Sequence, residues 1–176
     1  CNNLKTVEFP DVQELGGGMF SCCPNLEKVD IPKSVIKLGY CFFDGNYNLK
    51  EVSLPSVIEI GDSTFVYCTS LEKVTLGAVQ KIGKAAFWGD TQLTNIYLPA
   101  TMTEISKDAF AYCGNLSRII ITAIEPPACG MNVFEGIDGN CTVYVPKGCG
   151  ENYKTANEWK NMNIVETDLD GIDLPG

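Results

Sequence analysis

Matching leucines that recur every 22 or 23 residues constrain the fold of this chain more than any other sequence feature. They stand at Leu4, Leu26, Leu49, Leu71, Leu93 and Leu116. Each opens the pattern Leu-x-x-Val/Ile-x-apolar, which usually ends in proline. A fixed period of this length predicts a stack of small units that bury their apolar residues only against their neighbours.

A second block completes each of the first five repeats. It reads apolar-x-x-Ile/Leu-Gly/Ser-x-x-x-Phe and ends at Phe20, Phe43, Phe65, Phe87 and Phe110. The alternation in the first block predicts a short strand with one buried face, and the second block can form another short strand. The residues just before each phenylalanine are typical of a helical turn. We therefore expect a β-rich α/β fold, a right-handed leucine-rich-repeat solenoid of short parallel strands and helical turns.

The sequence predicts three regions. Residues 1–140 are the repeats, which start part-way through a unit and end in a degenerate copy with Pro126 and Pro127. Residues 141–165 are expected to cap the stack, with a last strand at 142–146 and a helix around 153–159. A cap is needed because an uncovered sheet edge would add another chain. Residues 166–176 are expected to be an acidic tail.

Small or polar residues stand three positions after each phenylalanine. This column contains Cys23, Asn46, Cys68, Asp90 and Cys113, and Cys1 holds the same place one repeat earlier. Stacked turns need such side chains at buried positions, where cysteine serves as a small apolar filler. We interpret most of the nine cysteines in this way. Cys129, Cys141 and Cys149, near the cap, either remain free or include one disulfide.

Composition narrows the range of functions. Thirteen basic and 22 acidic residues give a net charge of −9, which disfavours binding to nucleic acid. The absence of histidine removes Ser-His-Asp and Cys-His catalysis and His-bearing zinc sites. No apolar run approaches the roughly 20 residues of a membrane-spanning helix. We therefore expect no enzyme activity, no cofactor, no metal site and no transmembrane segment.

The repeat motif and the chain's ending resemble those of the BspA-like surface-antigen family of leucine-rich-repeat proteins. The motif is Cys-x-x-Leu-x-x-Val-x-Leu-Pro followed by Ile-Gly-x-x-Ala-Phe, and the ending is Val-Tyr-Val-Pro-Lys-Gly with a Tyr-Lys-x-Ala-Asn-x-Trp-Lys-Asn segment. The resemblance covers nearly the whole chain. It implies a bacterial protein that is secreted or displayed on the cell surface, and attachment to host matrix proteins such as fibronectin.

The outward strand positions suggest where a partner could bind. Tyr97, Ile120 and Tyr144 fall in one outward column, flanked by Asn95 and Arg118, and would form an exposed apolar stripe. The alternative is that the degenerate repeat or the cap folds over this stripe. The neighbouring columns alternate in charge, which predicts pairing from rung to rung.

The edge just after the phenylalanines is a secondary candidate. Tyr67, Trp88 and Tyr112 lie there, and they could either bind a partner or wedge the turns together.

Two functions fit these observations. The first is a binding or adhesion module that presents the face of a repeat sheet to a host protein or a glycan. The second is a structural spacer arm that binds nothing and belongs to a larger surface protein.

Overall fold

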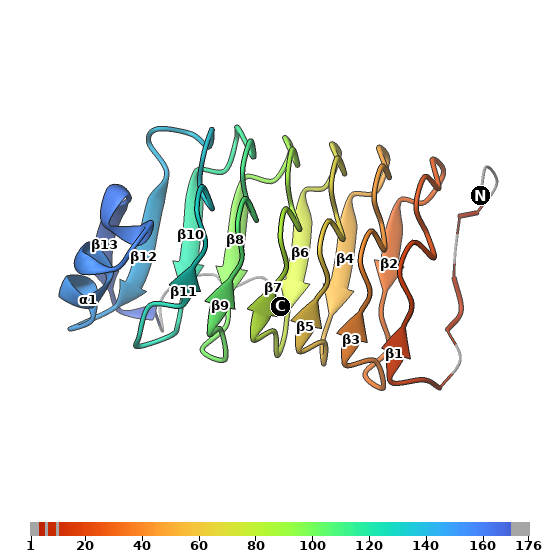
Figure 1. The fold of residues 1–176 in the computed structure, drawn as a ribbon, viewed down its shortest axis with the longest axis horizontal. Coiled ribbons are helices and arrows are strands. Elements are labelled where there is room, and N and C mark those ends of the chain that lie inside the picture. The colour runs from red at the N-terminus through yellow and green to blue at the C-terminus, as the bar shows by residue number, and fades with distance from the viewer. Residues whose placement is uncertain (1–3, 6, 10, 170–176) are drawn as a thin grey trace.

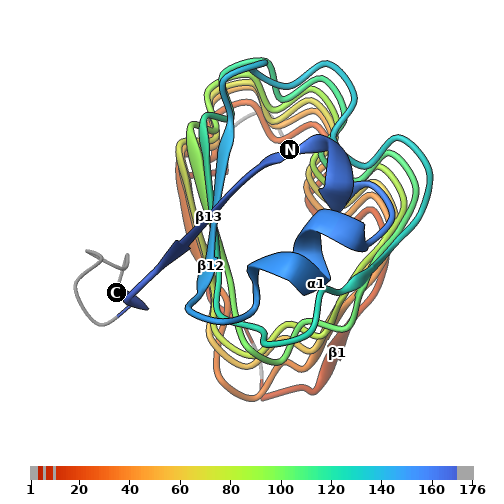
Figure 2. The same ribbon diagram turned by 90° about the vertical axis from the view of Figure 1, so that its left-hand side faces the viewer.

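The computed structural model is a solenoid whose short parallel strands stack rung upon rung along the long axis (Figure 1). It describes residues 4–5, 7–9 and 11–169, so Cys1 and most of the expected acidic tail lie outside the described residues. Viewed along the axis in Figure 2, successive rungs superimpose around one interior. The predicted solenoid fold is confirmed.

One side of the solenoid is a six-stranded parallel sheet made by the second block of each repeat. Each strand has two residues, and all but the last end in a buried leucine or isoleucine. The strands are β1 (Glu14–Leu15), β3 (Lys37–Leu38), β5 (Glu59–Ile60), β7 (Lys81–Ile82), β9 (Glu104–Ile105) and β11 (Ala128–Cys129). Because β11 belongs to this sheet, the degenerate repeat still contributes a rung.

The Leu-x-x-Val blocks form the opposite side, which consists of two sheets. One contains β2 (Lys28–Asp30), β4 (Glu51–Leu54) and β6 (Lys73–Leu76). The other contains β8 (Asn95–Leu98), β10 (Arg118–Ile121), β12 (Thr142–Pro146) and β13 (Asn163–Thr167). Strands β6 and β8 lie side by side (Figure 1) but belong to different sheets. This side of the solenoid is therefore interrupted at one step, between β6 and β8.

A ladder of stacked phenylalanine rings runs through the core. Neighbouring rings have centroids 5.0 to 6.3 Å apart and planes within 21° of parallel. The ladder runs through Phe20, Phe43, Phe65, Phe87, Phe110 and Phe134. Phe134 comes from the degenerate repeat, so the core continues where the sequence motif fades. Offset or parallel stacking of this kind adds to the apolar area that each rung buries.

The segments before each phenylalanine are single hydrogen-bonded turns and not the expected helical turns. The Ala86 N–H donates to the Gly83 carbonyl oxygen at 3.3 Å, and the Ala109 N–H donates to that of Ser106 at 3.3 Å. Within these turns the backbone enters the left-handed region, with φ of 52° at Ala85 and 59° at Asp108. A residue in that region ends a right-handed helix.

The cap closes the C-terminal end with α1 (Gly150–Thr155), the 3₁₀ helix η1 (Trp159–Asn161) and β13 (Figure 2). The Trp159 ring packs 4.9 Å from Phe134 and extends the aromatic ladder. Its Nε1–H donates to the Pro127 carbonyl oxygen at 3.0 Å, and the buried Tyr153 hydroxyl donates to that of Ala123 at 2.8 Å. Every polar group of these two rings thus has a partner, as burial requires.

Strand β13 was not foreseen and crosses the boundary that we expected between cap and tail. Its Glu166 carboxylate accepts hydrogen bonds from the Gly148 and Gly150 N–H groups, at 3.0 and 2.8 Å. These bonds lower the pKa of Glu166. Glu166 is therefore part of the capping structure. Cys129, Cys141 and Cys149 are free, as are the other cysteines among the described residues.

The described residues contain no helix of sufficient length and apolar character to cross a bilayer.

Candidate binding surfaces

The first candidate surface is the outer face of β8, β10 and β12. The strand register places Ile120 opposite both Tyr97 and Tyr144, so the three predicted residues are neighbours in one column. Both tyrosines are half-buried. The Tyr97 hydroxyl lies 3.3 Å from the Thr122 hydroxyl, within hydrogen-bond distance.

The prediction that Ile120 is exposed is wrong, because its side chain is only 3% accessible. Adjacent strands of a sheet lie about 4.8 Å apart, so larger side chains in register on both sides cover a smaller one between them. Tyr97 and Tyr144 stand in these flanking positions. The column therefore presents two separated tyrosines and no continuous apolar stripe.

Asn95 and Arg118 are exposed beside this column and pair in register with each other. The Asn95 amide donates to the Thr94 hydroxyl at 2.9 Å. These two side chains give the tyrosine column a polar flank on the same sheet.

Ion pairs between neighbouring rungs cover much of the remaining strand surface. Glu51 lies between Lys28 and Lys73, at 3.4 and 3.8 Å. On the six-stranded sheet, Lys37 pairs with Glu59 at 3.2 Å and Lys81 with Glu104 at 3.6 Å. The predicted pairing of alternating charges is confirmed. Exposed pairs of this kind contribute little stability, about 0–1 kcal/mol each, and mainly favour the correct register.

The second candidate surface is the edge of the turns, where Tyr67, Trp88 and Tyr112 form an aromatic row. The Trp88 ring centroid lies 4.8 Å from that of Tyr67 and 5.2 Å from that of Tyr112. Both contacts are edge-to-face, with interplanar angles of 86° and 67°. Tyr67 is 45% and Tyr112 is 47% exposed. We call these three residues the turn-edge triad.

The two tyrosines of the triad occupy unusual backbone. Tyr67 has φ of 57° and Tyr112 has φ of 61°, in the left-handed region that favours glycine. This position, two residues after the phenylalanine, is occupied by glycine on three other rungs, at Gly45, Gly89 and Gly136.

Each of these rings also leans onto a glycine of the next rung. A Cβ added at Gly89 would come within 3.2 Å of the Tyr67 ring, and one at Gly136 within 2.8 Å of the Tyr112 ring. The alternation of tyrosine and glycine along this edge is therefore sterically coupled.

An acidic side chain completes the triad at one end. The Tyr112 hydroxyl donates to the Glu135 carboxylate at 3.2 Å. The charge of Glu135 and this hydrogen bond raise the pKa of the Tyr112 hydroxyl, which therefore remains a neutral donor at physiological pH. Sequence reasoning identified the three aromatic residues but missed Glu135 and the left-handed backbone. The alternation with Gly45, Gly89 and Gly136 was the signal that could have revealed the backbone.

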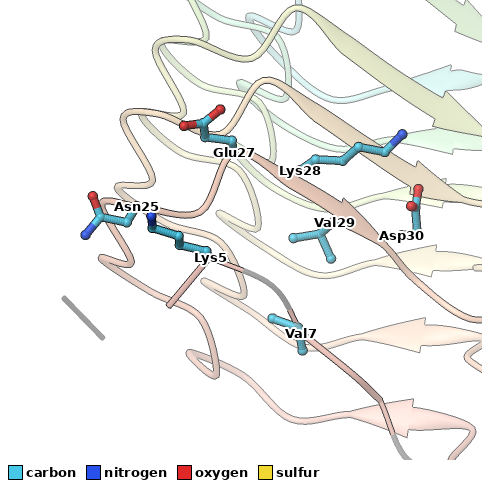
Figure 3. A pocket seen from close by; sticks show the side chains of 7 residues that line it. All are labelled: Lys5, Val7, Asn25, Glu27, Lys28, Val29 and Asp30. Carbon is cyan, nitrogen blue, oxygen red and sulfur yellow. The ribbon is translucent and has the colours of Figure 1, made fainter. Parts of the chain in front are cut away.

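A hollow of about 500 Å³ opens at the N-terminal end, between β2 and the residues Lys5 and Val7 (Figure 3). Val7 and Val29 lie in its middle, and Lys5, Lys28 and Asp30 are among the side chains around it. Its lining mixes both signs of charge and does not select one class of ligand. Within the described residues, no group of three or more Cys, Asp or Glu side chains is placed to hold a metal ion.

Comparison with proteins of known structure gives the same architecture. A leucine-rich-repeat protein from T. pallidum is 27% identical, with a TM-score of 0.64 over 76% of this chain and 66% of that one. A leucine-rich-repeat protein from Bacteroides ovatus is 26% identical, with a TM-score of 0.59 over 94% of this chain and 48% of that one. The chain thus spans about two-thirds and about half of the lengths of these two proteins.

No curated protein shows significant similarity to the sequence. The family described as BspA type leucine rich repeat region matches residues 1–87 and 58–166, with six copies. This chain therefore belongs to the BspA-type leucine-rich-repeat family.

Proposed function

We propose that this chain is a non-catalytic binding module that contacts a protein partner through the turn-edge triad. It would act outside the bacterial cell or at its surface, as the family resemblance implies. The observation that carries the proposal is the exposure of two tyrosines on backbone that glycine would adopt with less strain. Tyr67 and Tyr112 hold φ near 60° while almost half of each side chain faces solvent.

The energetics support a role other than stability. A non-glycine residue in the left-handed region costs roughly 1–2 kcal/mol. An edge-to-face aromatic contact returns about 0.5–1.5 kcal/mol beyond the area that it buries. The two terms nearly cancel, so only the buried half of each ring contributes net stability to the solenoid. Exposed, rigidly held tyrosine and tryptophan side chains are frequent hot spots in protein interfaces.

The arrangement of the rings favours a protein over a glycan. Trp88 stands edge-on to both tyrosines, so the triad offers ring edges, ring faces and hydroxyl groups in alternating orientation. A platform that stacks several sugar rings of a glycan in a row would need aromatic faces turned the same way. The Glu135 carboxylate beside Tyr112 adds a charged acceptor at the rim, which suits a partner with a basic or amide side chain.

The sheet face is a second candidate surface for the same function. Tyr97 and Tyr144 remain half-exposed there and have Asn95 and Arg118 beside them. Burial of Ile120 between the tyrosines weakens this surface, because the central apolar contact is removed. A spacer arm that binds nothing is the competing function, and the extensive ion pairing of the strands would suit a solvated surface of that kind.

The test is a binding screen of the purified chain against immobilised host matrix proteins, beginning with fibronectin, and against a glycan array. The main variant is Tyr67→Gly/Tyr112→Gly, which deletes both rings and places the favoured residue on the left-handed backbone. The matched control is Tyr97→Ser/Tyr144→Ser, which alters the sheet face. Thermal melts of both variants establish that the solenoid is intact.

The proposal is supported if the wild-type chain binds a protein saturably, the turn-edge variant binds it with at least tenfold lower affinity, and the control variant binds it like the wild type. Loss only in the sheet-face variant would move the contact to β8 and β12. Binding to glycans alone would contradict the partner class, and silence of the wild-type chain across both screens would favour the spacer.

A further inference from the structure

The column of small side chains three residues after each phenylalanine supplies hydrogen bonds to the core. At Asn46, Cys68 and Cys113 the column residue donates to the phenylalanine carbonyl of the preceding rung. The Asn46 amide donates to the Phe20 carbonyl at 2.7 Å and to that of Phe43 at 2.6 Å. The Cys68 thiol donates to the Phe43 carbonyl at 3.2 Å, and the Cys113 thiol to that of Phe87 at 2.9 Å.

Asp90 occupies this column between Cys68 and Cys113, and it breaks the series. Its side chain is fully buried, and neither carboxyl oxygen has a hydrogen-bond partner among the described residues. By the pattern of the column, its partner should be the Phe65 carbonyl. That carbonyl accepts the local Cys68 N–H at 3.0 Å, and the described residues give it no side-chain donor. An ionised carboxylate cannot donate a hydrogen bond, whereas a protonated one can.

The strand side of the solenoid is interrupted between the same two rungs, those of Cys68 and Asp90. Asp90 lies in the turn that leads into β8, and Cys68 lies in the turn that leads into β6. Between β6 and β8 the strand side of the solenoid changes from one sheet to the other. The six-stranded sheet continues from β5 to β7, and turn bonds such as Tyr67 N–H to the Trp88 carbonyl at 3.0 Å continue as well. The step therefore holds together with fewer hydrogen bonds than its neighbours.

We infer that Asp90 is a neutral carboxylic acid that donates a hydrogen bond to the Phe65 carbonyl across the step between β6 and β8, and that the need to keep this proton makes the folded solenoid less stable as the pH rises. The solenoid is then held more tightly in acid than in alkali at this one place. The inference is independent of the proposed binding function, because it concerns the core and not the turn edge.

The groups around Asp90 agree with a neutral acid. Burial raises the pKa of Asp90 well above its ordinary value. The Cys68 N–H faces the carboxyl and lowers this pKa by less, but it donates its hydrogen bond to the Phe65 carbonyl and leaves both carboxyl oxygens without a well-formed bond. The titratable side chains that face it are the Cys68 and Cys113 thiols of the two adjacent rungs, whose pKa values are also raised by burial. Neither thiol is a cation, so neither compensates a negative charge at Asp90.

The direction of the pH dependence follows from proton binding. Below the pKa of an aspartate in an unfolded chain, about 4, both states carry the proton and no stability is lost. Above it, the unfolded chain releases the proton while the folded chain retains it. The folding equilibrium constant then falls about tenfold for each pH unit, up to the raised pKa of the folded state.

The test compares wild type with Asp90→Asn by chemical denaturation between pH 4.5 and 8. Asparagine has a precedent at Asn46, so the variant should fold, and its amide can donate to the Phe65 carbonyl at every pH. We expect the stability advantage of Asp90→Asn to grow by about tenfold in the unfolding constant per pH unit across the lower part of this range. Asp30→Asn, an exposed site on β2, serves as the control for removal of a charge.

Two further measurements do not depend on that variant. Asn46→Asp places a carboxyl on another rung of the column and should acquire the same pH dependence. Infrared spectra of the wild type at neutral pH should show the carbonyl band of one protonated carboxyl group, since exposed carboxylates are ionised there. A wild-type spectrum without this band, or an advantage of Asp90→Asn that does not change with pH, would overturn the inference.

Discussion

Two columns of residues on the same turns, only two positions apart in each repeat, behave in opposite ways. The phenylalanine column is the same residue on every rung, is buried, and stacks ring on ring from Phe20 to Phe134. The column two residues later alternates between glycine and a larger residue at the turn edge. It reads Cys22, Gly45, Tyr67, Gly89, Tyr112 and Gly136, and all six have positive φ.

The difference separates what builds the solenoid from what the solenoid can present. A buried phenylalanine stacks on the rings of the rungs on both sides, so a change at one position disturbs both neighbours, and the same residue recurs. A turn-edge residue needs only a left-handed backbone and room above the next rung, so the residue type can vary. Variation at constant backbone is what a binding surface requires.

Truncation of the phenylalanine ladder should give the largest effect. Phe65→Ala removes a fully buried ring stacked between Phe43 and Phe87 at 5.4 and 5.0 Å, and should destabilise the chain by about 3–5 kcal/mol. Chemical denaturation measures this loss. A loss under about 1 kcal/mol would show that the ladder is not the main support of the stack.

The buried polar column should respond less than the ladder. Asn46→Ala leaves the Cys23 N–H, which donates to the Asn46 side-chain oxygen at 3.0 Å, without a partner in the core. We expect a loss of about 2–3 kcal/mol in the free energy of unfolding. Asn46→Cys, which restores a thiol donor like that of Cys68, should recover part of it. Equal stability of the two variants would mean that a thiol donor at this position does not support the column.

Exchange of the turn-edge tyrosines for glycine should affect stability less than either of these changes. In Tyr67→Gly/Tyr112→Gly, relief of the left-handed backbone offsets the lost ring contacts, and the buried half of each ring is lost besides, so the free energy of unfolding should fall by about 2 kcal/mol. Denaturation of this variant beside Phe65→Ala compares the two columns directly. A loss as large as that of Phe65→Ala would make the triad structural and would remove the main argument for its role in binding.

The surface ion pairs should give the smallest effect. Lys37→Gln removes the partner of Glu59, and both side chains are about half exposed, at 46% and 45%. We expect a change below about 0.5 kcal/mol, which salt reduces further because exposed pairs are screened. The measurement is the melting temperature at low and high salt. A clear loss at high salt would point to packing of the lysine stem and not to charge.

Sequence period and residue type were enough to predict the solenoid, its parallel strands and the buried column. They failed where the outcome depends on neighbours from distant parts of the chain. The exposure of Ile120 could not be judged without the register that sets it between Tyr97 and Tyr144. Strand β13 follows no repeat motif, so no pattern in the sequence indicated that it pairs with β12. The hydrogen bonds that Glu166 accepts in the cap could not be predicted for the same reason.

The sequence by itself determined the rung, because local alternation and a fixed spacing decide which residues each turn buries. It also placed Tyr67 and Tyr112 at one edge, since residues at the same position of a repeat must stack, with Trp88 one position earlier on the rung between them. Only the tertiary structure decided that two of these rings stand on left-handed backbone, that Asp90 lacks the partner its neighbours have, and that β6 and β8 do not pair. Those properties depend on contacts between neighbouring rungs. The residue pattern of one repeat does not specify which atoms of the next repeat will contact it.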